Sequence, residues 1–180
     1  MGQGQGRARD SGKGGIIAGI TRTLYILRHA KAENEDGMRD VERALTQRGR
    51  RSATRVGELI ADRLPDRVLA SSSLRTRETV EYFSKAAGYR GPVEYLDSLY
   101  LAAPSAYVAA VTERGGDAAR LMLVGHNPGL EELVTLLTGE RVSLPTAALV
   151  ECSLEVATWS DVTFDTRAEL VGLSFPRDDD

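Results

Sequence analysis

The chain has 180 residues, of which 42% are hydrophobic and 27% charged, a balance typical of one soluble globular domain. Its net charge of −3 gives no basis for a nucleic-acid partner, because domains that bind nucleic acids are usually strongly basic. No apolar run reaches the roughly 18 residues that cross a bilayer, and no signal peptide is evident, so no membrane partner is expected. The single cysteine, Cys152, excludes an intrachain disulfide and predicts a buried or half-buried thiol in a cytoplasmic protein.

The first 20 residues differ in composition from the rest of the chain. They are rich in glycine, and Gly2, Gly4 and Gly6 could suggest a phosphate-binding loop. No strand precedes these glycines and their spacing does not fit such a loop. We therefore expect residues 1–20 to form a disordered tail and residues 21–180 to form one domain.

Strand and helix signals alternate along the central part of the chain. Four short apolar, β-rich runs predict strands at Thr23–Leu27, Arg67–Ala70, Val93–Tyr95 and Leu121–Val124. Helices are predicted at Thr46–Leu64, with Thr46 as N-cap, and at Ser71–Gly88, Pro104–Thr112 and Pro128–Leu137. The first helix carries one apolar face, made of Ala53, Val56, Leu59 and Ile60. This alternation predicts an α/β fold with a mostly parallel sheet.

The pattern changes in the last part of the chain. Ala147–Val156 and Phe164–Phe175 read as two longer strands, joined by a turn near Ser160. Because no helix separates them, they should pair in an antiparallel manner at one edge of the sheet. The complete prediction is a three-layer α/β/α architecture, with a mostly parallel central sheet and an antiparallel edge near the C-terminus.

An arginine and a histidine, Arg28 and His29, follow the first predicted strand. Ligands of open α/β sheets bind at the carboxyl ends of the strands. Adjacent strand positions point to opposite faces, so the chain must bend for both side chains to reach one ligand. A nucleophilic histidine beside an anion clamp is one interpretation, and two unrelated surface residues are the simpler explanation of the dipeptide by itself.

Two further polar motifs follow the second and fourth predicted strands. Ser71–Ser73 start a helix whose free N–H groups favour an anion, and Arg75 in its first turn could grip phosphate oxygens with its planar fork. Arg77 is expected to be a solvated helix charge. Gly125 permits close backbone approach, and His126 precedes another helix start. Two histidines and two arginines at strand ends predict chemistry on an anion.

The ordered set of motifs resembles the histidine phosphatase superfamily. The segments that carry the resemblance are Leu27–Ala30, Ser71–Arg75 with Thr79, and Val124–Pro128. The short chain and the segment Asp40–Gly49 are similar to the SixA-like branch, which includes phosphohistidine phosphatases. The resemblance extends from about Thr23 to Pro176.

The resemblance implies roles for five residues. His29 matches the nucleophile that becomes phosphorylated, and Arg28, Arg75 and His126 match residues of the phosphate pocket. Arg43 matches an arginine of the SixA-like branch that reaches the bound anion. His29 must attack as neutral imidazole, and a backbone carbonyl or a hydroxyl should hold its other ring nitrogen. Cationic side chains neutralise the phosphoryl group, so neither a metal ion nor a cofactor is expected.

A general acid is missing from the expected place. Many members of the superfamily protonate the leaving group with a carboxylic acid located after the third strand, where this chain reads Leu96–Ala102 without a glutamate. Asp97 and the loop carboxylates Glu33, Asp36 and Asp40 are possible substitutes, and none is assigned. Phosphohistidine releases an imidazole, which leaves more easily than an alkoxide, so a site without a strong acid favours a P–N bond.

The sequence therefore predicts a metal-independent phosphatase that forms a phosphohistidine intermediate and acts on phosphohistidine in a protein. A phosphomonoesterase for small phosphorylated metabolites on the same scaffold stays open as an alternative. A phosphoglycerate-type mutase would need a longer chain and a clear acid. A non-catalytic phosphate-binding module would need the arginines but no nucleophile. The oligomeric state is left open.

Overall fold

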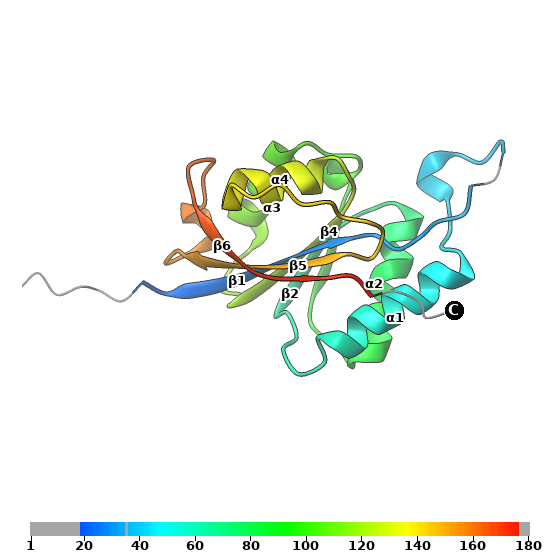
Figure 1. The fold of residues 1–180 in the computed structure, drawn as a ribbon, viewed down its shortest axis with the longest axis horizontal. Helices are drawn as coiled ribbons and strands as arrows, with labels where there is room; N and C mark the ends of the chain where they lie inside the picture. Colours follow the sequence, from blue (N-terminus) through cyan, green and yellow to red (C-terminus); the bar gives the residue numbers. More distant parts are fainter. Residues whose placement is uncertain (1–18, 35, 177–180) are drawn as a thin grey trace, which may run out of the picture.

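The computed structural model describes residues 19–34 and 36–176, and its centre is one six-stranded sheet (Figure 1). The strands are β1 (Thr21–Arg28), β2 (Arg67–Ser71), β3 (Val93–Leu96), β4 (Arg120–Gly125), β5 (Leu149–Glu155) and β6 (Ala168–Ser174). Their order in the sheet is β3-β2-β4-β1-β5-β6. The tail expected at residues 1–20 lies outside the described residues except for its last two.

The helices form the two outer layers. They are α1 (Gln47–Leu59), α2 (Leu74–Ala87), α3 (Pro104–Arg114) and α4 (Gly129–Thr138). Helices α1 and α2 pack together on one face of the sheet, and α3 and α4 cover the other (Figure 1). The first four strands run parallel, whereas β5 is antiparallel to both β1 and β6. The predicted three-layer α/β/α fold with an antiparallel edge is confirmed.

Local signals in the sequence explain most helix boundaries. The Thr46 hydroxyl accepts a hydrogen bond from the Gly49 N–H at 2.9 Å, as its N-cap assignment requires. Helix α2 ends at Gly88, which has the left-handed backbone that glycine adopts without strain. Helix α1 ends earlier than predicted, and Leu59 is 38% exposed rather than in the core. Leu59 lies about 100° round the helix from the buried Ile60, outside the apolar stripe.

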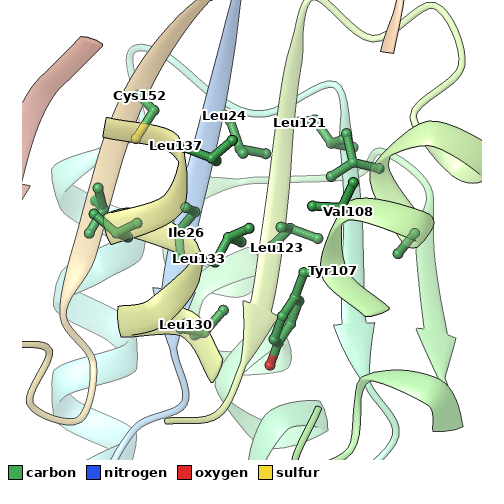
Figure 2. Close-up of a cluster of buried hydrophobic side chains, with 14 of the residues drawn as sticks. Leu24, Ile26, Tyr107, Val108, Leu121, Leu123, Leu130, Leu133, Leu137 and Cys152 are labelled. Atoms are coloured by element: carbon green, nitrogen blue, oxygen red, sulfur yellow. The ribbon is translucent and has the colours of Figure 1, made fainter. Parts of the chain in front are cut away.

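The sheet separates two hydrophobic cores because successive side chains of a strand point to opposite faces. Along β1, Leu24 and Ile26 face α3 and α4, and Tyr25 and Leu27 face α1 and α2. Figure 2 shows the first of these cores, with Cys152 among its members. The thiol is fully buried, as predicted, and burial raises its pKa to about 12.

The two C-terminal strands complete the sheet. Strand β5 pairs with β1 along its whole length, and β6 lies outside it as the edge strand. Trp159, in the connection between them, is buried and donates its indole N–H to the Ala118 carbonyl at 2.7 Å. Among the helices of the described segments, none has the length and apolar character needed to cross a bilayer.

Candidate active site

The carboxyl ends of three neighbouring parallel strands create a cleft of about 370 Å³. Strand β4 lies between β1 and β2, so the residues that follow these three strands meet at one edge of the sheet. All five residues singled out from the sequence line the cleft, namely Arg28, His29, Arg43, Arg75 and His126. The structure therefore brings the predicted residues together. Arg77 is exposed instead, with its guanidinium 4.1 Å from the centre of the Tyr95 ring.

His29 is held in one orientation just beyond the end of β1. Its backbone N–H donates to the Gly125 carbonyl at 3.1 Å, where the chain leaves the strand. Its Nδ1 lies 2.8 Å from the Ala30 carbonyl, which can only accept, so the ring proton belongs on Nδ1. The lone pair is then on Nε2, which lies 3.4 Å from Nε of Arg75 inside the cleft. The expected carbonyl partner of the other ring nitrogen is therefore that of Ala30.

His126 faces His29 across the cleft, with their ring centres 5.1 Å apart. Its Nε2 lies 2.7 Å from the Ser71 hydroxyl at the end of β2, and its backbone N–H donates to the Tyr107 phenol oxygen at 3.0 Å. Figure 2 shows that Tyr107 belongs to the core beneath α3, and that its oxygen points in the direction in which β4 runs. A side chain at Gly125 would place Cβ 2.2 Å from that oxygen, so glycine is required there.

Both rings are kept neutral by their surroundings. Burial, opposed in part by the Ala30 carbonyl and assisted by His126 and the neighbouring arginines, lowers the pKa of His29 to about 3. Burial and the charge of Arg75 lower the pKa of His126 to about 4. A neutral His29 carries the free lone pair that nucleophilic attack requires.

Arg28 and Arg75 both line the cleft but have different hydrogen-bond partners. Arg75 is 3% exposed, and its Nη2 lies 3.4 Å from Nδ1 of His126. The Nη1 of Arg28 donates to the Leu144 carbonyl at 2.8 Å, and Asn127 donates to the same carbonyl at 2.9 Å. The Nε of Arg28 is buried without a hydrogen-bond partner in the described part of the chain, so a donor is left for an anion.

Arg43 and Asp40 come from the loop between β1 and α1. The Nε of Arg43 donates to the Glu33 carbonyl at 2.5 Å, and its Nη1 contacts a carboxylate oxygen of Asp40 at 3.1 Å. The same carboxylate accepts from Arg75 at 3.0 Å and from the Tyr100 hydroxyl at 2.5 Å. The Tyr100 hydroxyl and the two arginines hold the pKa of the Asp40 carboxyl well below its usual range.

Tyr100 was not predicted from the sequence, and Asp40 only as one of several possible acids. The segment Leu96–Ala102 has no glutamate, and no local pattern marks the phenol of Tyr100 as a partner of Asp40. The two residues are 60 positions apart in the chain. Of the other possible acids, Asp36 and Asp97 are exposed, and Glu33 contributes its backbone carbonyl.

The depressed histidine pKa values predict how stability depends on pH. An unfolded histidine titrates near pH 6.5, whereas folded His126 stays neutral down to about pH 4. The unfolded state therefore binds more protons between these values, and stability falls as the pH is lowered. The slope is up to about 1.4 kcal/mol per pH unit for each such histidine.

We expect His126→Gln to reduce this slope by about 1 kcal/mol per pH unit between roughly pH 6 and 4.5, measured by urea unfolding at several pH values. Ser71→Ala is the matched control, because it removes the hydroxyl beside Nε2 and leaves His126 to titrate. Ser71→Ala should lower the free energy of unfolding at every pH and change its slope against pH little. Parallel curves for His126→Gln and the wild type would show that His126 is not held neutral.

Comparisons with known proteins agree with the geometry. A family model described as the histidine phosphatase superfamily (branch 1) matches residues 24–100, from β1 to the end of the segment after β3. An uncharacterised protein of Mycobacterium tuberculosis is 34% identical over 165 residues, covering 84% of this chain and 100% of the relative. An uncharacterised chloroplastic protein of Arabidopsis thaliana is 32% identical over 146 residues, covering 73% of this chain and 67% of the relative.

Two solved structures, each described provisionally as the phosphohistidine phosphatase SixA, are similar along most of the chain. The one from Nakamurella multipartitia has a TM-score of 0.76 and 29% identity, covering 87% of this chain and 96% of its own. The one from Agrobacterium tumefaciens has a TM-score of 0.73 and 28% identity, covering 86% of this chain and 98% of its own. With the family model and the relatives, they show that the chain belongs to the histidine phosphatase superfamily, in its SixA-like branch.

Proposed function

We propose that the protein is a phosphohistidine phosphatase that works through a phosphorylated His29. The observation that carries the proposal is the arrangement of His29, whose Nδ1 is held by the Ala30 carbonyl while its Nε2 faces the arginine-lined cleft. A module that only bound phosphate would need the cations and no oriented lone pair.

The first step transfers the phosphoryl group to the enzyme. The lone pair of His29 Nε2 attacks phosphorus while the P–N bond to the substrate breaks, and the substrate ring, protonated on its other nitrogen, departs with the bonding electron pair as neutral imidazole. Arg28, Arg43 and Arg75 neutralise the phosphoryl oxygens, and such positioning with charge neutralisation is most of what phosphoryl transfer requires. A bound dianion would raise the pKa of His126, whose Nδ1 could then donate a hydrogen bond. Water hydrolyses the P–N bond to His29 in the second step, releasing inorganic phosphate.

The carboxylates near the cleft support a P–N substrate. Asp40 is the carboxylate that lines the cleft, and its two oxygens already accept from Arg43, Arg75 and Tyr100. A carboxyl whose pKa lies well below its usual range is a poor proton donor near pH 7. A departing imidazole, with a conjugate-acid pKa of about 6.5, depends less on such a donor than an alkoxide does.

Three further features belong to the same proposal. The cationic side chains take the place of a metal ion, and no group of three potential metal-ligating side chains occurs among residues 19–34 and 36–176. The substrate is a phosphorylated protein, with a small phosphorylated metabolite as the alternative. The buried, single Cys152 supports a cytoplasmic location.

The experiment that tests the substrate compares leaving groups. We expect kcat/KM for a phosphohistidine peptide to exceed that for a serine-phosphate peptide of the same sequence by at least about 10³-fold, because only the latter needs strong acid catalysis. Release of inorganic phosphate from both peptides gives the ratio. Comparable rates would instead favour the phosphomonoesterase, and a screen of phosphorylated metabolites would then identify its substrate.

A further inference from the structure

We propose that Asp40 is a positioning residue that orients Arg75 and Arg43 for the transferred phosphoryl group, with Tyr100 fixing its carboxylate. The inference rests on the proposed function, because it concerns the phosphoryl-transfer step of the same cleft. It concerns a residue whose carboxylate the transfer itself does not use.

The contacts of Arg75 divide its guanidinium into two edges. On one edge, Nη1 donates to the Asp40 backbone carbonyl at 2.7 Å and Nη2 donates to the Asp40 carboxylate at 3.0 Å. On the other edge, Nε and Nη2 lie 3.4 Å from His29 Nε2 and His126 Nδ1, respectively. The first contacts are short and the second are long and weak. Asp40 therefore anchors one edge and leaves the other directed at the space between the two imidazoles.

The Asp40 carboxylate also connects the two arginines to each other. Its second oxygen accepts from Nη1 of Arg43 at 3.1 Å, so one side chain sets the positions of two cations that start from different elements. Arg75 belongs to the first turn of α2, whereas Arg43 follows the 3-10 helix at Asp40–Glu42. Without an acceptor between them, two like charges facing one cleft would repel, and the buried Arg75 would lack a counter-ion.

Tyr100 restrains the same carboxylate through its hydroxyl. Its hydroxyl donates to the oxygen of Asp40 that also binds Arg75, at 2.5 Å. Its ring lies edge-on to the His126 ring, with centres 5.6 Å apart, and the Arg75 guanidinium carbon is 5.9 Å from its centre. The Asp40 side chain is 43% exposed, so without the phenol it could rotate toward solvent. We infer that the phenol keeps the carboxylate on Arg75.

The test replaces the Asp40 carboxylate with an uncharged amide and removes the Tyr100 hydroxyl. Asp40→Asn should lower kcat by about 10–100-fold with KM changed less than about threefold, since the orientation of Arg75 matters most in the transition state. Tyr100→Phe keeps the ring and removes one hydrogen bond, so a fall of about 3–10-fold is expected. Asp36→Asn, an exposed carboxylate of the same loop, is the matched control and should leave kcat unchanged.

A second measurement separates positioning from general structural damage. In single-turnover assays, Asp40→Asn should lower the rate by a much smaller factor when Arg75 is already alanine, because only Arg43 then remains for Asp40 to orient. An equal loss in both backgrounds, or an unchanged kcat in the single variant, would overturn the proposal.

Assays with both a phosphohistidine peptide and p-nitrophenyl phosphate distinguish this inference from the proposed function. If the wild type hydrolyses only the nitrophenyl ester, the proposed substrate is wrong, and the ratio between variant and wild type on that ester still tests Asp40. A wild type that hydrolyses neither compound contradicts both proposals.

Discussion

Replacing His29 with alanine is expected to reduce turnover by at least about 10⁴-fold and to abolish the acid-labile ³²P label on the protein. The variant loses the nucleophilic Nε2 that faces Arg75 in the cleft. Single-turnover assays with labelled substrate, quenched in alkali, measure both quantities.

His126→Gln is the control for this experiment. It removes the other histidine of the cleft and leaves His29 in place, so the label should still form at a reduced rate. A His29→Ala variant that still labels or turns over would remove His29 from the nucleophile role. If the label disappears only in His126→Gln, His126 is the nucleophile and His29 is the residue that assists it.

The second large effect is expected at Arg75. Arg75→Ala should lower kcat by about 10³-fold or more. The variant lacks the buried guanidinium, directed at both imidazoles, that stabilises the negative charge of the phosphoryl group in the transition state. Arg75→Lys should recover only a small part of this loss. An ammonium keeps the charge, but it cannot bind Asp40 with one edge and face the phosphoryl group with another.

Steady-state kinetics on the phosphohistidine peptide measures both variants. Arg77→Ala is the matched control, since Arg77 lies in the same turn of α2 and is exposed outside the cleft. It should retain wild-type kcat and KM. A lysine variant with nearly full activity would show that Arg75 acts through charge alone, and would also weaken the role inferred for Asp40.

Local patterns were enough for the fold class and for placing Arg28, His29, Arg75 and His126 at strand ends, whereas Arg43 followed only from the family resemblance. Helix boundaries depend on nearby residues such as Thr46 and Gly88, whose effect on the backbone is local. The residues after β1, β2 and β4 meet because parallel strands of one sheet end at the same edge. The motif order along the chain could therefore predict His29, Arg75 and His126 as neighbours.

The proton position, the pKa values and the role of Asp40 depend on tertiary structure. The Ala30 carbonyl selects the tautomer of His29, and burial keeps that ring neutral. Asp40 could be named from the sequence only as one of several loop carboxylates, and Tyr100 carried no signal. Hydrogen-bond geometry and desolvation arise between segments far apart in the chain, and no local periodicity encodes them. The sequence therefore sufficed to place two histidines at the ligand edge of an α/β sheet. Their unequal settings, and the carboxylate that orients the arginine between them, required the folded chain.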